Sequence, residues 1–296
     1  MDLLAIKNTL FCKQSFCAKQ IQPYIIKGDN KKKRLVEDPS HALKRIQARI
    51  KDLLQEIPVE RYVFSGTKGV SYTNNAQFHK DSSNYLFKTD ITGFFPSISR
   101  ESVYQFFHCD LKMSPDTAKM ITNFLTIDLL RIQCNNLEDV FNFLYKKGIT
   151  CTNHLLTGSP ASTVLSYLVN HRLFDTLYEY ASKNSIIMSV YIDDIVFSSN
   201  TRIPNSFRKK VLHLIKMYDF NPSKDKTKYY TQTQPKLVTG VILSNHELKV
   251  PNKLRRKAIQ SYANHSPGDV RSIQVAKGVL NSARQIEPEI FPSFSL

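Results

Sequence analysis

The sequence has few of the features that mark secreted, membrane-spanning or repetitive proteins. Its 296 residues contain five cysteines, nine glycines and no tryptophan. Because the number of cysteines is odd and no CxxC pair occurs, we expect neither a disulfide framework nor a structural zinc site. No apolar run approaches the roughly 20 residues of a membrane-spanning helix, and Asp2 and Lys7 interrupt the apolar residues near the start. These absences predict a cytoplasmic protein without a secretory signal.

Basic residues are in excess, and the excess is unevenly distributed. Lys and Arg number 41 against 25 Asp and Glu, a formal net charge of +16. Residues 61–200 hold 12 basic and 12 acidic residues, whereas residues 201–296 hold 17 basic and 6 acidic ones. With 42% hydrophobic residues the chain is not mainly disordered. The charge indicates a polyanionic partner, either a nucleic acid or an acidic membrane surface.

The order of the expected elements favours an antiparallel α+β core with helices on its flanks. Apolar periodicity predicts helices at residues 41–54, 115–132, 158–182 and 207–218, and two basic helices from residue 252 onward, split near 266–268. Residues 85–95 are expected to be a strand that leads into a turn, residues 186–199 a hairpin, and residues 236–243 a strand broken by Gly240. Ser40 and Ser114 are the expected N-caps of the first two helices.

Three aspartates interrupt these apolar strands. Asp193 and Asp194 lie at the junction of the predicted hairpin, and Asp90 lies in the first strand. Unpaired carboxylates in such surroundings repel each other and lose hydration, so a purely structural role is unfavourable. Mg²⁺ binds oxygen ligands and neutralises clustered acids. We therefore expect a cation at this point.

The carboxylates of a two-metal centre must come from more than one strand. Alternation sends Asp193 and Asp194 to opposite sides, so Asp193 needs a partner from elsewhere, and Asp90 is the obvious one. Two strands that each deliver a carboxylate to one point are typical of in-line phosphoryl transfer with two metal ions.

Four short motifs resemble those of bacterial retron reverse transcriptases. Residues 191–194 (YIDD) match the YxDD box of reverse transcriptases, and residues 90–95 (DITGFF) resemble their first catalytic strand. Residues 75–79 (NAQFH) match the retron NAxxH motif, and residues 238–240 (VTG) match the retron VTG motif. The resemblance extends over most of the chain, about residues 31–296. This order of motifs favours retrons over group II intron-like or diversity-generating reverse transcriptases.

The resemblance implies a right-hand polymerase with fingers, a ferredoxin-like antiparallel palm and a short helical thumb. The expected limits are an N-terminal extension at residues 1–30, fingers at 31–85, a palm with inserted finger helices at 86–235, and a thumb with the VTG region at 236–296. The basic thumb helices would grip a duplex through its phosphates and 2′-hydroxyls.

The implied reaction is RNA-directed DNA synthesis from dNTP substrates with two Mg²⁺ ions. The enzyme would copy its cognate retron non-coding RNA into multicopy single-stranded DNA, primed from a 2′-hydroxyl of a branching guanosine. It would act in anti-phage defence beside an accessory effector protein and away from membranes, with the template removed by host RNase H. The alternative of another class is a non-catalytic RNA-binding scaffold of polymerase fold, which the intact aspartates disfavour.

The resemblance also implies roles for individual residues. Asp90, Asp193 and Asp194 would be catalytic and bind metal, with the carbonyl oxygen of Ile91 as a further ligand. The expected nucleotide-binding residues are Lys33, Arg34, Phe95, Gly158 and Lys226. The expected RNA-binding residues are Val238, Thr239, Gly240, Lys253, Arg255 and Arg256.

Several of these residues have a plainer alternative. Phe95 would exclude a ribose 2′-hydroxyl, or else fill the core. Lys226 would contact or protonate the triphosphate, or else lie exposed in solvent. Thr157 stands where the family typically has Gln, which puts an amide-mediated contact beside Gly158 in question. For Asn75 and His79 we expect a structural role.

Overall fold

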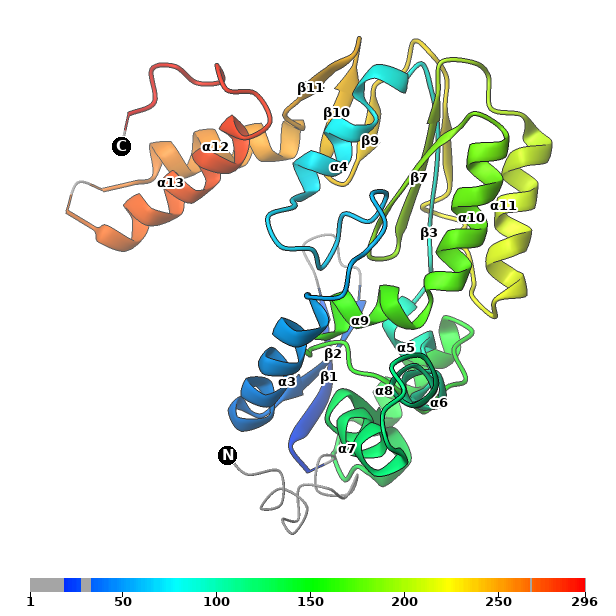
Figure 1. Ribbon diagram of the computed structural model, residues 1–296. Coiled ribbons are helices and arrows are strands. Elements are labelled where there is room, and N and C mark those ends of the chain that lie inside the picture. The colour runs from blue at the N-terminus through cyan, green and yellow to red at the C-terminus, as the bar shows by residue number, and fades with distance from the viewer. Residues whose placement is uncertain (1–18, 28–32, 267, 296) are drawn as a thin grey trace.

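The computed structural model describes residues 19–27, 33–266 and 268–295. A central antiparallel sheet covered by helices forms one half of the molecule, and helices around small two-stranded sheets form the other (Figure 1). The first 18 residues of the expected N-terminal extension lie outside the described residues, as do Lys31 and Lys32. Within the described ranges, no helix has the length and apolar content needed to cross a membrane.

The central sheet has four antiparallel strands in the order β6-β7-β3-β8. They are β3 (Tyr85–Asp90), β6 (Ile187–Tyr191), β7 (Asp194–Ser199) and β8 (Lys228–Tyr230). The predicted hairpin is confirmed, because β6 and β7 pair directly with Tyr191 opposite Asp194. The chain thus delivers the acidic pair at the tip of this hairpin.

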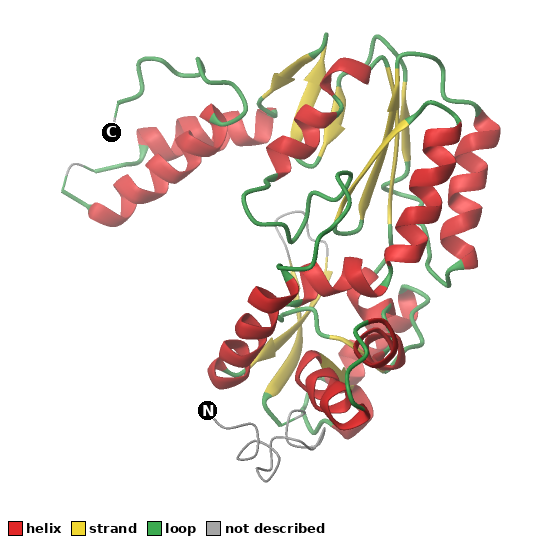
Figure 2. Ribbon diagram, in the orientation of Figure 1, coloured by secondary structure: helices red, strands yellow, loops and turns green. Residues whose placement is uncertain are grey.

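Both faces of the central sheet are buried, which explains the nearly continuous apolar character of its strands. On one face Phe87 and Phe197 stack, and Phe197 meets Phe207. That face is covered by α10 (His171–Lys183) and α11 (Asn205–Met217) (Figure 2). On the other face Leu86 and Val196 pack into a second core.

The second half of the molecule is built around the β1–β2 hairpin. β1 (Ile21–Lys27) pairs with β2 (Lys33–Pro39), and β4 (Thr126–Asp128) pairs with β5 (Asn153–Leu155). The helices of this half are α3 (His41–Leu54), α5 (Phe94–Ser97), α6 (Arg100–Gln105), α7 (Pro115–Leu125), α8 (Leu137–Lys146) and α9 (Ser162–Val169). The hydroxyls of Ser40 and Ser114 accept backbone N–H bonds as predicted N-caps.

Two helix predictions were wrong in their extent. The helix expected to run to residue 132 ends at Leu125, because the residues that follow pair as β4 with β5. The helix expected at residues 158–182 starts only at Ser162 and is two helices, α9 and α10. Asn170 separates them, and its side chain donates a hydrogen bond to the Ser166 carbonyl, competing with continuation of the helix.

The last part of the chain holds a small sheet and two helices. The sheet order is β11-β10-β9, with β9 (Lys236–Val238), β10 (Val241–Ser244) and β11 (Glu247–Lys249). The expected single strand at 236–243 is therefore a hairpin: Thr239 and Gly240 form a two-residue turn with φ of +43° and +89°. Helix α4 (Tyr72–Phe78) packs on β10 and β6. Helices α12 (Asn252–Ala263) and α13 (Val270–Arg284) lie side by side and extend away from the central sheet (Figure 1).

Candidate active site

The acidic tip of the β6–β7 hairpin is a strained turn. Its two central residues are Ile192 and Asp193, and Ile192 has a φ of +62°. A β-branched side chain in this region costs on the order of 1–3 kcal/mol. The turn is held by Ser65, whose hydroxyl accepts the Ile192 N–H at 2.8 Å. Such strain at an acidic turn is typical of a functional site.

Asp90 and Asp194 face each other across β3 and β7, and Asp193 lies in the turn beside them, so the register differs from the expected pairing of Asp90 with Asp193. Asp90 lies directly opposite Asp194 in the strand register, so their side chains share one face of the sheet. The Ile91 N–H donates to the Asp193 carbonyl at 3.0 Å, which ties the end of β3 to the turn. Asp90 is only 4% exposed. The expected convergence of the first strand and the hairpin is therefore present.

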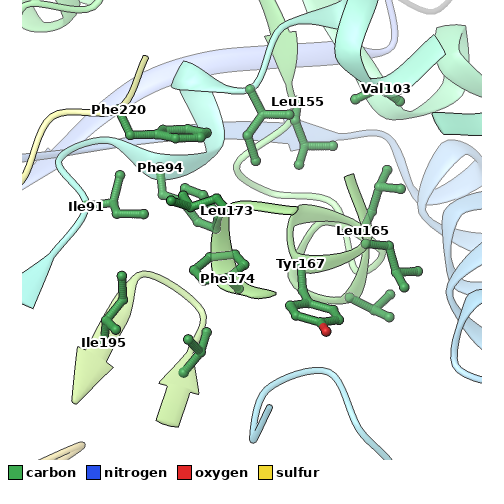
Figure 3. Close-up of a cluster of buried hydrophobic side chains, with 14 of the residues drawn as sticks. Ile91, Phe94, Val103, Leu155, Leu165, Tyr167, Leu173, Phe174, Ile195 and Phe220 are labelled. Atoms are coloured by element: carbon green, nitrogen blue, oxygen red, sulfur yellow. The ribbon is translucent and has the colours of Figure 1, made fainter. Parts of the chain in front are cut away.

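A packed aromatic cluster supports the segment after Asp90. The Phe94 ring lies 6.1 Å from Phe174 and 5.4 Å from Phe220, centroid to centroid (Figure 3). Gly93, which precedes Phe94, has a φ of +58°, and a Cβ there would collide with Ile149. The glycine thus lets the chain turn tightly between Asp90 and Phe95.

Burial and mutual repulsion make the carboxylates resist ionisation. Burial, and then the charge of Asp90, raise the pKa of Asp193 to about 7. Burial also raises the pKa of Asp194, with Asp90 adding to the effect. A divalent cation would remove this penalty, so the chemistry of the donor set fits one. Among the described residues, however, no three His, Cys, Asp or Glu side chains lie close enough to form a metal site by themselves.

Lys226 is the cation that contacts Asp90. Lys228 of β8 lies opposite Lys88 of β3, which brings Lys226 beside Asp90. The Lys226 Nζ lies 2.5 Å from Asp90 Oδ2. Burial lowers the pKa of Lys226, but the hydrogen bond and charge of Asp90 outweigh it, so the pKa is raised and the ammonium stays charged.

A cavity of about 510 Å³ opens in front of Asp90 and Asp193. Its wall comes from both halves of the molecule and joins acidic, basic and aromatic side chains. The lining residues are Arg34, Leu35, Asp90, Ile91, Thr92, Gly93, Phe94, Phe95, Pro96, Phe143, Lys147, Thr157, Ile192, Asp193, Ser223 and Lys226. Cationic groups facing two carboxylates across a cavity of this size suit a phosphate-bearing ligand.

The predicted nucleotide-binding residues divide into two groups. Arg34, Phe95 and Lys226 line the cavity, and Phe95 is half-buried and also packs against the hydrophobic core. Lys33 is exposed at the start of β2 and does not line it. Gly158 does not line it either. It packs against β2 instead, where a Cβ on this residue would collide with the carbonyl oxygen of Glu37. The close approach that Gly158 permits is therefore to the protein's own chain.

Sequence reasoning missed Lys147 and Phe143 of this wall. The Lys147 ammonium lies 4.6 Å from the centre of the Phe143 ring, a cation–π contact. Burial, and then the charge of Lys226, lower the pKa of Lys147, whereas Asp90 and Asp193 raise it. The pair Lys146–Lys147 before Gly148 was the available signal, but basic residues at a helix end are common.

A model of the family described as reverse transcriptase (RNA-dependent DNA polymerase) matches residues 25–243. The chain belongs to the reverse transcriptase family. It is similar to the retron Se72 reverse transcriptase of Salmonella heidelberg (strain 579083-10), with 26% identity over 240 residues. It is also similar to the retron Ec83 and Ec86 reverse transcriptases of Escherichia coli, each at 25% identity, over 263 and 246 residues. The predicted retron resemblance is confirmed.

These alignments cover 77%, 86% and 81% of this chain and 56%, 79% and 67% of the Se72, Ec83 and Ec86 proteins. The chain thus spans little more than half the length of the Se72 relative. A solved telomerase from Candida albicans, in complex with a telomeric RNA fragment, matches 95% of this chain and 56% of its own with a TM-score of 0.50 and 8% identity. The right-hand polymerase fold predicted from the sequence is confirmed.

Two retron motifs of this reverse transcriptase are in contact, although 164 residues separate them. Asn75 Nδ2 donates to the Thr239 hydroxyl at 3.5 Å, and that hydroxyl donates to the Tyr72 carbonyl at 2.9 Å. His79 is fully buried between the hydroxyls of Ser198 and Ser189, at 2.6 and 2.7 Å. Burial lowers the pKa of His79 to about 3, so it is neutral. The side chains of Asn75 and His79 thus join α4 to the VTG turn and to the catalytic hairpin.

The residues predicted to bind RNA differ in accessibility. The Val238 side chain is fully buried in the second core, so any RNA contact at that position is limited to its backbone. Thr239 and Gly240 form the turn at its surface. Arg255 donates to both carboxylate oxygens of Glu287 and to the Val250 carbonyl. Lys253 and Arg256 are exposed on α12.

Proposed function

We propose that this chain is an RNA-directed DNA polymerase that joins dNTPs on an RNA template. The observation that carries the proposal is that Asp90 and Asp193 line one cavity together with three cationic side chains. The bond from the Ile91 N–H to the Asp193 carbonyl ties the end of β3 to the turn that holds Asp193. Family membership and the polymerase fold support the same activity. Burial and the charge of Asp90 raise the pKa of Asp193, which supports a functional site over a solvated acidic turn.

The aspartates would hold two Mg²⁺ ions, with Asp90 and Asp193 as main ligands and Asp194 and the Ile91 carbonyl beside them. When bound, the ions would activate the attacking primer hydroxyl and stabilise the charge that develops on the α-phosphate. Lys226 is paired with Asp90, and from its place on the cavity wall its ammonium would also bind a triphosphate oxygen.

The other cavity residues would select and orient the nucleotide. Arg34 presents a guanidinium fork suited to phosphate oxygens, and Lys147 adds a point charge. The Phe95 ring would occupy the space of a ribose 2′-hydroxyl and so favour deoxynucleotides. The backbone placed by Gly93 brings this ring to the cavity wall.

We further propose the retron activity. Similarity to three retron reverse transcriptases and the contact between the NAxxH and VTG segments support copying of a cognate retron RNA into multicopy single-stranded DNA, primed from a 2′-hydroxyl of a branching guanosine. Thr239, Gly240 and exposed residues of α12 such as Lys253 and Arg256 would contact that RNA. The proposal includes a cytoplasmic location, an accessory effector in anti-phage defence and template removal by host RNase H.

The same proposal assigns residues 31–85, 86–235 and 236–296 to fingers, palm and thumb. The basic excess of residues 201–296 supports binding of a nucleic-acid duplex by the thumb. The equal numbers of basic and acidic residues in 61–200 support an active site whose positive charge comes from bound metal ions.

Incorporation of dNTPs by the purified chain on an RNA template with Mg²⁺ tests the polymerase. We expect incorporation by the natural protein and none by Asp193→Asn, which keeps the shape of the side chain. No incorporation by folded, RNA-loaded protein would identify a scaffold instead. Sequencing of co-purified nucleic acid, with and without debranching enzyme, tests the retron activity. An RNA–DNA molecule without a 2′–5′ linkage would exclude branch priming and favour another class of reverse transcriptase.

A further inference from the structure

A fully buried ion pair joins β2 to β5, the strand that precedes the cavity residue Thr157. The carboxylate of Glu37 on β2 and the imidazole of His154 on β5 are both 0% exposed, and Glu37 Oε1 lies 2.7 Å from His154 Nε2. The two residues are 117 positions apart in the chain. Replacing such a pair by apolar residues is often neutral or stabilising, so its presence calls for a role other than stability.

The hydrogen bonds of His154 define its protonation state. Its Nδ1 lies 3.0 Å from the Cys151 carbonyl, which can only accept, so Nδ1 carries a proton. Nε2 faces the Glu37 carboxylate, so a second proton lies between these two groups. Burial lowers the pKa of His154, but Glu37, the Cys151 carbonyl and the charge of Asp128 on β4 outweigh it, and the pKa is raised. The pair thus holds two protons, one on Nδ1 of His154 and one between Nε2 and the carboxyl group of Glu37.

The rest of Glu37 is bonded to Thr157, which lines the cavity. The Thr157 N–H donates to Glu37 Oε2 at 2.9 Å, and the Glu37 N–H donates to the Thr157 hydroxyl at 2.9 Å. Gly158 completes the junction, because only a residue without a Cβ fits against the Glu37 carbonyl oxygen. These contacts hold β2 against the turn at residues 157–158.

Arg34 lies three residues before Glu37 on the same strand and lines the cavity with Leu35 and Thr157. The side chain of Arg34 is exposed, and within residues 19–27, 33–266 and 268–295 it forms no hydrogen bond or ion pair that sets its position. Where β2 sits relative to Thr157 therefore decides how far the guanidinium reaches over Asp90 and Asp193. A displacement of about 1 Å at such a group is enough to weaken ligand positioning strongly.

We propose that Glu37 and His154 are positioning residues, which hold Arg34 over the nucleotide cavity through the junction with Thr157. They thereby set the affinity for the triphosphate of the incoming dNTP, and the chemical step itself is left to the aspartates. This role rests on the proposed polymerase activity. It also gives Thr157 a function. Its hydroxyl accepts a hydrogen bond from the Glu37 N–H of β2, at a position where the family typically has the amide side chain of Gln.

Steady-state extension of oligo(dT) on poly(rA) by the full chain, with dTTP varied, tests the role. For His154→Leu we expect the KM for dTTP to rise about tenfold while kcat changes less than about twofold. Glu37→Gln should keep KM near the natural value at neutral pH. Its carboxamide donates to the free Nε2 of a neutral His154 and still accepts the Thr157 N–H.

Two further variants separate positioning from folding. Thr157→Val removes the acceptor for the Glu37 N–H without changing side-chain size, and we expect it to raise KM, whereas Thr157→Ser should not. Asp38→Asn is the matched control, because Asp38 neighbours Glu37 on β2 but pairs at the surface with Lys44. It should leave KM and kcat unchanged.

Amide hydrogen exchange gives a readout that does not depend on activity. The Glu37 and Thr157 amides should exchange faster in His154→Leu and Thr157→Val than in the natural protein and in Asp38→Asn. If the natural protein incorporates no dTTP, the proposed polymerase activity is overturned. If it incorporates dTTP but both disruptive variants keep the natural KM, or lose kcat in proportion to lost folded protein, only the positioning role is overturned.

Discussion

Asp193→Asn should stabilise the metal-free protein while abolishing polymerisation. The native fold holds the ionised Asp193 partly buried beside Asp90, and its pKa rises from the ordinary 3.8 to about 7. A folded-state pKa above the unfolded value means that the native state binds more protons. Stability is therefore lost as the pH rises from about 4 to about 7. An amide in the same place carries no charge and avoids this penalty.

The size of the effect follows from the pKa. The difference between 3.8 and about 7 corresponds to about 4 kcal/mol at 1.36 kcal/mol for each pH unit. This value already includes the attraction of Lys226 for Asp193. An asparagine also loses hydration on burial, which reduces the gain. We therefore expect a net gain of about 1–2 kcal/mol at pH 8, or about 2–3 °C in Tm for a chain of this size.

Thermal unfolding in EDTA, followed by circular dichroism, measures this gain. The difference between Asp193→Asn and the natural protein should shrink at pH 5, where the native carboxyl is protonated. Adding Mg²⁺ should stabilise only the natural protein, because the variant lacks the ligand. Asp81→Asn, an exposed carboxylate, is the control for the charge change alone. A variant less stable than the natural protein at pH 8 in EDTA would refute the reasoning.

Four further substitutions probe the cavity and its support. Phe95→Ala should raise ribonucleotide incorporation relative to deoxynucleotides by about tenfold or more, measured with paired rNTP and dNTP assays; an unchanged ratio would return Phe95 to a packing role. Lys147→Ala should raise the KM for dNTPs about fivefold to tenfold, while the exposed neighbour variant Lys146→Ala should not. His79→Leu should lower the free energy of unfolding in urea by about 2–4 kcal/mol, because two buried hydroxyls lose their hydrogen-bond partner. In the natural protein, the stability contributed by the neutral His79 is complete above pH 6.5 and is lost as the pH falls toward about 3. Gly240→Ala should lower the free energy of unfolding by about 1 kcal/mol, because alanine is strained at this left-handed backbone position while its Cβ would meet only open space. A larger loss of stability would indicate another contact.

Local pattern predicted the elements whose signals lie within a few residues. The hairpin around Asp193 and the N-caps Ser40 and Ser114 were confirmed because alternation and capping act over one to four positions. The predicted length of the helix after Ser114 was wrong, since residues 126–128 pair with a strand far along the chain. No local signal reports such a partner.

The same limit applies to the site. The aspartates were visible because a carboxylate in an apolar strand is unfavourable without a partner. Lys147, by contrast, looks like any basic residue at a helix end, and becomes notable only where α8 reaches the cavity wall. Gly158 was recognised as a point of close approach, but its neighbour is Glu37.

The sequence by itself determined that this is a reverse transcriptase with an acidic hairpin, a near-neutral centre and a basic final third. Those properties reside in residue types, short spacings and charge counts, which need no fold to be read. The tertiary structure alone decided the pairings over long separations: Asp90 with Lys226, Asn75 with Thr239, and Glu37 with His154. They arise where strands and helices from distant parts of the chain pack against one another, which brings together side chains that no local pattern connects.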